Sequence, residues 1–253
     1  MNIKKMVFEM LPEALQHRII LKKTGHHLYE NAQATPNIHF SIYTTPKIGV
    51  WKTRLQTPYG HEPQVVKWFE RNLNATDVIY DIGAHMGYYA VVASKMAPGV
   101  EFHAFEANWF IAHYLKLNKQ LHDTTGSWHI VEKFVGKENK KGFVVVDQYI
   151  QSRKPSSIFF MDVDGEEINV LNGAKQLLEK GNCTFLIEVH PADLKDRNQY
   201  VPELLQLFSP EKYALRYLPN HRGKDSVWGE HISDQDIQQE FFLLATPTKN
   251  PRF

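Results

Sequence analysis

The sequence predicts an α/β fold built on an open, mostly parallel sheet with helices on both faces. From residue 77 onward, short apolar runs alternate with longer amphipathic segments, and this alternation is typical of strand–helix–strand units. Several of the apolar runs end at glycine or acidic residues. Because ligands of open parallel sheets bind at the carboxyl ends of the strands, these residues are the first candidates for a functional site.

Residues 1–60 are predicted to form a helix and strand extension. Residues 7–22 carry apolar side chains at helical spacing, and Thr24-Gly25 ends this predicted helix. Residues 38–55 are rich in β-branched and aromatic residues, which predicts two short strands broken at Thr45-Pro46. We expect the extension either to cap a pocket or to pair subunits in a homodimer.

Residues 61–253 are predicted to form the main domain. A helix begins at Pro63 and runs to about residue 73. The apolar runs predict strands at 78–82, 101–105, 127–135, 143–146, 157–161 and 184–189, with a closing pair at 213–218 and 241–246. The amphipathic segments predict helices at 88–95, 108–121 and 166–180, and near 201–208. Residues 191–200 and 219–232 are polar and are predicted to be loops that select the substrate.

The charge balance is close to neutral, since 29 Lys and Arg residues face 28 Asp and Glu residues and leave a net charge of +1. This balance gives no long-range field for nucleic acid. The single cysteine, Cys183, excludes an intrachain disulfide and a cysteine-rich zinc site. No apolar run reaches the roughly 18 residues that a membrane span needs, and Glu9 and Glu13 interrupt any signal-like stretch. We therefore expect a cytoplasmic protein with no membrane span and no nucleic-acid partner.

The residues around the first strand of the main domain predict a nucleoside site. The predicted strand at 78–82 is followed by Gly83 and Gly87, which let the backbone turn sharply and approach a ligand. The next helix then offers its N-terminal amides to a negative group. Glu106 ends the second strand, where a carboxylate can accept both hydroxyls of a ribose.

The glycine spacing favours S-adenosylmethionine over a dinucleotide. A dinucleotide fingerprint starting at Gly83 would need glycines where His85 and Tyr88 stand, which argues against a nicotinamide oxidoreductase. No Gly-Lys-Ser/Thr follows, so a phosphate-binding P-loop is also excluded. S-adenosylmethionine carries an amino-acid end instead of a pyrophosphate, and Asp81 is placed to meet its ammonium group.

Four ordered motifs resemble those of the FkbM-type methyltransferases. They are Asp81-Ile82-Gly83-Ala84-His85-Met86-Gly87-Tyr88-Tyr89, then Phe105-Glu106-Ala107-Asn108 with Leu117-Asn118, then Asp162-Val163-Asp164-Gly165-Glu166-Glu167 with Val170-Leu171-Asn172-Gly173-Ala174, and finally Ile187-Glu188-Val189-His190. The pair Glu62-Pro63 also stands where that family often has it. The family usually has different residues where His85, Ala107, Phe160 and Asp164 stand here.

The resemblance implies that residues 61–253 form a class I, Rossmann-like methyltransferase domain with a seven-stranded sheet. It further implies an S-adenosylmethionine-dependent O-methyltransferase that acts on a hydroxyl of a carbohydrate or related small molecule. The predicted cofactor-binding residues are Glu62, Asp81, Gly83, Ala84, His85, Gly87, Glu106, Ala107, Gly136 and Asp162.

Acidic and histidine residues at two neighbouring strand ends are the candidates for catalysis. A hydroxyl acceptor is a poor nucleophile, so a base helps methyl transfer. His190 is the first candidate because its ordinary pKa lies near neutral pH, and Asp162 and Asp164 are the next. The same residues with Glu188 could instead hold Mg²⁺ or Mn²⁺, and Glu188 could equally be a buried carboxylate that joins two loops.

Two further function classes stay open at this point. A degenerate methyltransferase fold that binds ligands without turnover is one, favoured by His85 and Phe160. A nucleic-acid methyltransferase is less favoured, because the chain lacks an Asn/Asp-Pro-Pro-aromatic motif and a basic charge balance.

Overall fold

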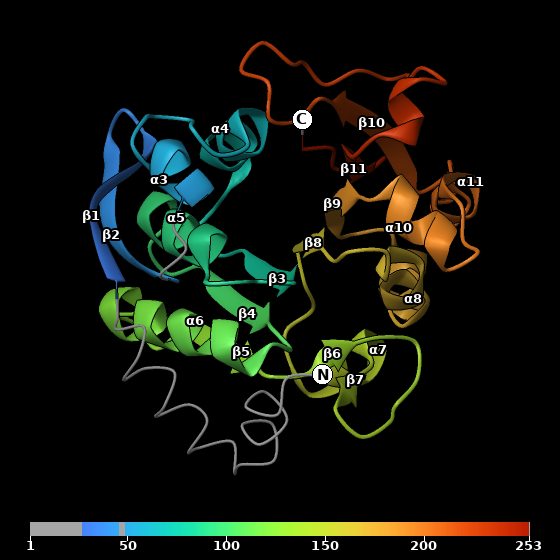
Figure 1. The fold of residues 1–253 in the computed structure, drawn as a ribbon. Coiled ribbons are helices and arrows are strands. Elements are labelled where there is room, and N and C mark those ends of the chain that lie inside the picture. The colour runs from blue at the N-terminus through green and yellow to red at the C-terminus, as the bar shows by residue number, and fades with distance from the viewer. Residues whose placement is uncertain (1–26, 46–48, 253) are drawn as a thin grey trace, which may run out of the picture.

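The computed structural model describes residues 27–45 and 49–252. The predicted helix over residues 7–22 lies outside these described residues. The described chain forms one large sheet flanked by helices, with an additional hairpin (Figure 1).

The large sheet has seven strands in the order β10-β11-β9-β8-β3-β4-β5. Five of them run parallel to one another: β3 (Val78–Ile82), β4 (Glu101–Phe105), β5 (Trp128–Val131), β8 (Ile158–Asp162) and β9 (Thr184–Val189). The strand β11 (Phe241–Pro247) runs antiparallel to both β9 and β10 (Tyr213–Pro219). The predicted open, mostly parallel sheet is therefore confirmed.

Two apolar cores lie on opposite faces of this sheet because successive strand residues point to opposite sides. One core joins the sheet to the hairpin and to the helices α4 (Pro63–Asn72), α5 (Tyr88–Met96) and α6 (Trp109–His122). The other joins it to the helices α7 (Val146–Tyr149), α8 (Glu167–Asn172), α9 (Lys175–Lys180), α10 (Pro191–Asp196) and α11 (Val201–Leu205). Short 3₁₀ turns, η1 (Ile150–Ser152) and η2 (Asp236–Gln238), follow α7 and precede β11.

The hairpin of β1 (His27–Thr35) and β2 (Ile38–Thr44) lies beside α5 and α6 (Figure 1). Buried Asn118 on α6 accepts a hydrogen bond from the Tyr43 amide at 2.7 Å and donates to the Tyr43 carbonyl at 3.0 Å. The same amide group donates to the Met86 carbonyl at 2.8 Å. One side chain thus fastens the hairpin, α6 and the turn after β3 together.

The strand prediction for residues 38–55 is wrong in its second half. The helix α3 (Gly49–Leu55) replaces the second predicted strand, and the partner of β2 is β1, which comes earlier in the chain. Residues 191–200, predicted as a loop, begin with α10. Its proline lies in the first helical turn, where a missing amide costs nothing.

The single helix predicted over residues 166–180 is divided into α8 and α9. Asp147 causes the division, because its carboxylate accepts hydrogen bonds from the amides of Gln176 at 2.9 Å and Leu177 at 3.3 Å and so caps α9. At the break, a Cβ on Gly173 would lie 2.2 Å from the Gly136 carbonyl oxygen, so the two segments pack in direct contact.

The predicted strand over residues 127–135 is also divided. β5 ends at Val131, and β6 (Phe134–Val135) leaves the sheet to pair in parallel with β7 (Phe143–Val144). Val146, predicted to end that last strand, instead begins α7.

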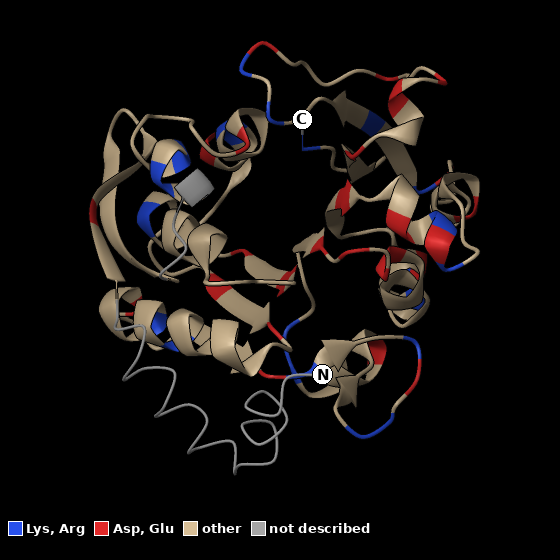
Figure 2. Cartoon of the chain, viewed as in Figure 1, with Lys and Arg blue, Asp and Glu red and all other residues tan. Residues whose placement is uncertain are grey.

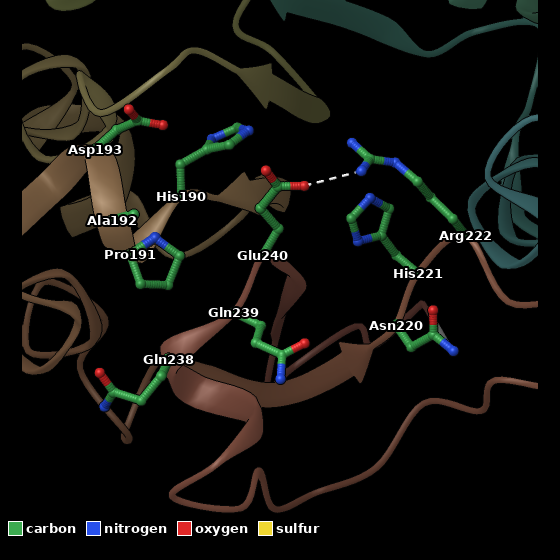
Figure 3. A pocket seen from close by; sticks show the side chains of 10 residues that line it. All are labelled: His190, Pro191, Ala192, Asp193, Asn220, His221, Arg222, Gln238, Gln239 and Glu240. Carbon is green, nitrogen blue, oxygen red and sulfur yellow. Dashed lines mark ion pairs between the residues drawn. The ribbon is translucent and has the colours of Figure 1, made fainter. Parts of the chain in front are cut away.

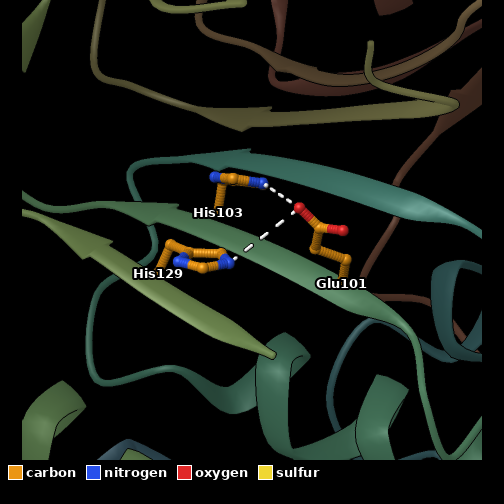
Figure 4. Close-up of side chains that lie close together, drawn as sticks. All are labelled: Glu101, His103 and His129. Atoms are coloured by element: carbon orange, nitrogen blue, oxygen red, sulfur yellow. Dashed lines mark hydrogen bonds and ion pairs between the residues drawn. The ribbon is translucent and has the colours of Figure 1, made fainter. Parts of the chain in front are cut away.

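A polar cluster of Glu101, His103 and His129 lies at the amino ends of β4 and β5 (Figure 4). The His103 Nε2 atom lies 3.0 Å and the His129 Nε2 atom 3.9 Å from Glu101 Oε1. Lys154 forms an ion pair of 2.8 Å with the other carboxylate oxygen of Glu101. Among the described helices, none is long and apolar enough to cross a membrane.

Candidate functional site

A cavity of about 650 Å³ opens at the carboxyl ends of β3, β4, β8 and β9. We call it the larger cavity. The turn after β3 forms part of its wall, and this turn needs glycine at residue 83. Gly83 has a φ of +88°, and a Cβ there would lie 1.9 Å from the Asp162 carbonyl oxygen. The amides of Gly83 and Ala84 both donate to the Phe105 carbonyl, at 2.9 and 3.0 Å, which ties the turn to β4.

Asp81 points a buried carboxylate at this cavity. The residue is 1% exposed and lines the cavity wall, and its Oδ1 atom has no hydrogen-bond partner among the described residues. Burial, with a smaller contribution from the charge of Glu106, raises the pKa of Asp81 well above its usual range. A buried carboxylate oxygen without a partner is costly, so this atom is suited to receive a cationic or hydrogen-bonding group of a ligand.

Glu106 lies beside it at the end of β4. Its two carboxylate oxygens accept the amide of His85 at 3.0 Å and the amide of Asn108 at 2.7 Å. Burial raises the pKa of Glu106, and these two backbone hydrogen bonds oppose the increase. A carboxylate offers about four lone-pair sites, so Glu106 is fixed in orientation and can still accept two hydroxyl groups.

Aromatic rings form the side walls of the larger cavity. The Trp51 indole from α3 stacks on the His85 ring, with centroids 5.9 Å apart. Phe134 and Phe143, from β6 and β7, stack on each other at 5.2 Å along another part of the wall. These flat, apolar surfaces suit an aromatic ligand group such as a nucleobase.

The four residues proposed for catalysis or metal binding meet at the ends of β8 and β9. Asp162 and Glu188 are direct partners in the strand register. The Nε2 atom of His190 lies 3.7 Å from Asp162, 3.8 Å from Asp164 and 3.9 Å from Glu188. Figure 2 shows acidic residues at these two strand ends.

His190 is held by a buried partner, Glu167. Glu167 is 0% exposed, and its Oε1 atom lies 2.8 Å from His190 Nδ1 and accepts the His190 amide at 3.0 Å. Burial opposes the imidazolium, but the Glu167 hydrogen bond and the charges of Glu188 and Asp162 outweigh it and raise the pKa of His190 to about 9. At neutral pH His190 therefore carries a proton and is less suited to be the base than the sequence analysis expected.

Glu62 joins the same cluster from the start of α4. It occupies the N-cap position, yet its side chain makes no capping hydrogen bond and instead accepts the Tyr89 hydroxyl. Burial and the charge of Glu188 raise the pKa of Glu62 to about 7, against the effect of Tyr89. Glu62, Glu188 and His221 each offer a ligand atom, and these atoms all lie within 4.8 Å of one another.

The Glu188 carboxylate is the centre of the cluster. Burial opposes its ionisation, but the neighbouring His221, His190 and Arg222 together lower the pKa of Glu188. The pKa of Asp162 changes in the opposite direction. Burial is the largest cause, the charges of Glu188 and Glu62 add to it, and together they raise the pKa of Asp162 to about 8.

A smaller cavity of about 420 Å³ adjoins this cluster, and Figure 3 shows the side chains that line it. His190 and His221 line it, and Arg222 lines both cavities. Arg222 forms an ion pair of 3.0 Å with Glu240 at its rim (Figure 3). The cluster of Asp162, Glu188 and the two histidines thus stands between two cavities.

Most of the predicted site residues line the larger cavity: Glu62, Asp81, Gly83, Ala84, His85, Glu106, Ala107, Asp162, Asp164 and Glu188. His190 lines the smaller cavity. Gly87 and Gly136 line neither, and their amides donate to the carbonyls of Ala84 and Val144.

Sequence reasoning missed several residues of the larger cavity, among them Trp51, Arg54, His61, Tyr89 and Arg197. His61 stands next to the quoted Glu62-Pro63 pair, and Tyr89 ends the first quoted motif, so both were within reach of the motif argument. Trp51 and Arg54 carry no such signal, because the segment was predicted as a strand.

The comparisons with known proteins bear on the fold. No family model and no curated protein matches the sequence. Among solved structures, the methyltransferase FkbM from Methylobacillus flagellatus KT matches with a TM-score of 0.50 and 14% identity, over 68% of this chain and 44% of that one. A protein from Clostridium thermocellum assigned as an rRNA-methylase matches with a TM-score of 0.51 and 10% identity, over 73% of this chain and 93% of that one.

The chain has a class I methyltransferase fold. At these identities the matches show the fold alone, and this chain spans less than half of the FkbM methyltransferase. In the methyltransferase fold, the larger cavity is placed where open parallel sheets bind their ligands, at the carboxyl ends of the strands.

Proposed function

We propose that this protein is an S-adenosylmethionine-dependent O-methyltransferase of the FkbM type, acting on a hydroxyl of a carbohydrate or related small molecule. One observation carries the proposal: Asp81 lines the cavity beside Glu106 and has a buried carboxylate oxygen with no hydrogen-bond partner among the described residues. A methyltransferase fold with this pair of acids at adjacent strand ends supports a cofactor that has both an ammonium and a ribose.

The residues present fit that cofactor. Asp81 would hold the ammonium group, and Glu106 would accept the ribose hydroxyls. The stacked pair Phe134 and Phe143 would cover the adenine. Gly83 serves the site indirectly, because it allows the turn after β3 to pass directly against β8.

The chain's own residues then act on the acceptor. Bound S-adenosylmethionine supplies a methyl carbon activated by a sulfonium. In its ionised form, Asp162 accepts the proton of the acceptor hydroxyl, since it lines the larger cavity and its side chain is 44% exposed. Its pKa of about 8 means that this form is the minor one at pH 7 and grows as the pH rises, and that it is a stronger base than an ordinary carboxylate. His190, held on Glu167, stays protonated and positions the carboxylates around it. The Trp51 and His85 rings help to exclude water from the reacting groups.

Calorimetric titration with S-adenosylhomocysteine tests the cofactor assignment. The unaltered protein is expected to bind it, and Glu106→Ala is expected to weaken binding by at least about tenfold, since two hydrogen bonds to a charged group are lost. Glu138→Ala removes the same charge at an exposed position outside the cavity and is expected to leave binding unchanged. NAD is the control ligand. Absence of S-adenosylhomocysteine binding to the unaltered protein would contradict the proposal.

Transfer of a labelled methyl group to a panel of glycans and small hydroxyl compounds tests the acceptor class. Asp162→Asn is expected to lower turnover while leaving cofactor binding within about twofold, because Asp162 acts on the acceptor. Cofactor binding without transfer to any hydroxyl acceptor would instead favour a degenerate, ligand-binding methyltransferase fold. Transfer to RNA or DNA alone would favour a nucleic-acid methyltransferase.

A further inference from the structure

We propose that Glu62, Glu188 and His221 bind a divalent cation in the wall between the two cavities. Cation binding itself does not depend on the proposed function. Its role does rest on that function: the cation would bind the acceptor's oxygen atoms and hold the reacting hydroxyl beside Asp162.

The three side chains converge on one point from three parts of the chain. Glu62 starts α4, Glu188 lies in β9, and His221 follows β10. They are 5%, 2% and 3% exposed, and their ligand atoms lie within 4.8 Å of one another. Cation–ligand distances of about 2.0–2.6 Å place neighbouring ligand atoms roughly 3–5 Å apart, so the spacing suits a shared cation.

His221 gives independent support for a ligand at this point. Neither ring nitrogen has a hydrogen-bond partner among the described residues, although the ring is buried. Its Nε2 atom lies 2.9 Å from Glu188 Oε1 but lacks hydrogen-bond geometry. A buried imidazole is normally hydrogen-bonded or bound to a metal. A cation bound by both His221 Nε2 and Glu188 Oε1 as neighbouring ligands would give the ring nitrogen a partner and balance the carboxylate.

The positive groups around Glu62 and Glu188 do not fully balance the negative charge of these two carboxylates, which favours binding of a cation. Glu62 and Glu188 are two buried carboxylates in proximity, which is unfavourable without a balancing charge. The Nε2 atom of His61 lies 3.5 Å from Glu62. His190, the other nearby histidine, is already paired with Glu167. Arg222 approaches Glu188 at 3.3 Å, is 51% exposed and is shared with Glu240. Since Arg222 reaches in from the surface, it can move aside when a cation binds.

Two other groups of ligand-type residues in the described chain are weaker candidates. In the cluster of Glu101, His103 and His129 (Figure 4), the ion pair of Lys154 with Glu101 already supplies the positive charge. In the group of Asp162, Glu188 and His190, the histidine already pairs with Glu167, and Asp162 is partly exposed. Asp162 therefore stays available to the acceptor.

The ligand set suggests the kind of cation. Two carboxylates and one imidazole suit Mn²⁺ and related first-row ions, and such a site leaves positions for oxygen atoms of an acceptor. His221 also lines the smaller cavity, so an acceptor that enters there would reach the cation. An acceptor with two neighbouring oxygen atoms, as in a sugar diol, fits this arrangement.

Electron paramagnetic resonance with Mn²⁺ and the full chain tests the site. Free Mn²⁺ gives a six-line signal that is lost when the ion binds, so the remaining signal measures the unbound ion. We expect one Mn²⁺ per chain. Glu188→Gln and His221→Leu are each expected to weaken binding by at least about tenfold. Glu101→Gln, in the cluster at the other end of the sheet, is the matched control and is expected to bind as the unaltered protein does. No stoichiometric binding, or a loss confined to Glu101→Gln, would overturn the proposal.

A second measurement uses the unaltered protein, so its result does not depend on whether a variant folds. Pulsed electron paramagnetic resonance of Mn²⁺ bound to the unaltered protein is expected to show coupling between the ion and an imidazole nitrogen. Absence of this coupling would overturn the assignment of His221 as a ligand. Glu106→Ala is expected to retain Mn²⁺ binding. If Mn²⁺ binds and S-adenosylhomocysteine does not, the cation site stands while the proposed function fails. If S-adenosylhomocysteine binds and Mn²⁺ does not, the reverse holds.

Discussion

Two residues of the cavity wall hold a backbone conformation that side chains disfavour. Glu62 has a φ of 41° and His85 a φ of 48°, both in the left-handed region. Such conformations cost of order 1–3 kcal/mol each and gather at functional sites. Glu62 also leaves its helix uncapped and turns its carboxylate toward Tyr89 and Glu188. Both positions line the larger cavity, where we propose that the cofactor and the acceptor bind.

Gly83→Ala tests the close approach of the turn to β8. The variant is expected to lose at least about 2 kcal/mol more stability than Gly142→Ala, because both positions have positive φ but only residue 83 meets a neighbouring atom. A Cβ at Gly142 would contact nothing within 4 Å. Chemical denaturation of both variants measures the difference in the free energy of unfolding. Equal losses of stability would show that the positive φ, and not the contact with β8, destabilises the Gly83 variant.

At the scale of elements, the sequence predicted the strands better than the boundaries of the helices. The strands β3, β4, β8 and β9 are short apolar runs buried on both faces, which leave a clear signal. The division between α8 and α9 leaves none, because the capping carboxylate of Asp147 comes from a distant segment. The helix α3 was missed since its β-branched and aromatic residues favour a strand locally.

The connection between α6 and the hairpin depends on Asn118. Asn118→Ala removes three hydrogen bonds from a fully buried position and is expected to cost about 1–3 kcal/mol in the free energy of unfolding. Asn172→Ala, which removes one hydrogen bond inside α8, is the control and is expected to cost less. Faster amide hydrogen exchange in β2 of the Asn118 variant would show that the hairpin is loosened; unchanged exchange there would contradict this role.

The start of β3 is held by an acid whose contribution depends on pH. Asp77 accepts two hydrogen bonds of 2.8 Å from Arg252. Burial opposes its ionisation, but these bonds and the Asn74 amide lower the pKa of Asp77. A lowered pKa means that the stabilisation is present above the unfolded-state pKa of about 3.9 and is lost as the pH falls.

Asp77→Asn is therefore expected to cost about 1.5–3 kcal/mol at pH 7 and progressively less below about pH 4. Urea denaturation of the variant and the unaltered protein across this range measures the difference. A cost that stays constant down to pH 3 would contradict the assignment.

At the scale of the whole molecule, the two cavities differ in how far the sequence predicted them. Asp81 and Glu106, the acids proposed to bind the cofactor in the larger cavity, lie in two compact motifs at consecutive strand ends, so a local sequence pattern was enough to find them. The smaller cavity combines side chains from the start of α10, the segment after β10 and the residues between η2 and β11. His221 was noticed only as a loop residue, because its approach to Glu188 depends on β10 and β11 closing the sheet.

Cofactor binding is expected to stabilise the entire sheet, since Asp81 lies in β3, Asp162 in β8 and Glu106 directly after β4. A ligand at about 100 times its dissociation constant stabilises the folded state by about 2.7 kcal/mol. For a chain of this size, that corresponds to a rise of roughly 5–10 °C in Tm. Differential scanning calorimetry with S-adenosylhomocysteine measures it. An equal rise in Glu106→Ala would contradict the proposed site.

The stacked pair of Trp51 and His85 gives the molecule an optical consequence. The indole rests on a histidine ring in the wall of the larger cavity, whereas Trp68 and Trp128 are buried in the apolar core. A molecule that enters the cavity changes the polarity around Trp51 and its contact with the imidazole. The intensity and wavelength of its fluorescence should therefore follow occupancy in real time, without an attached dye.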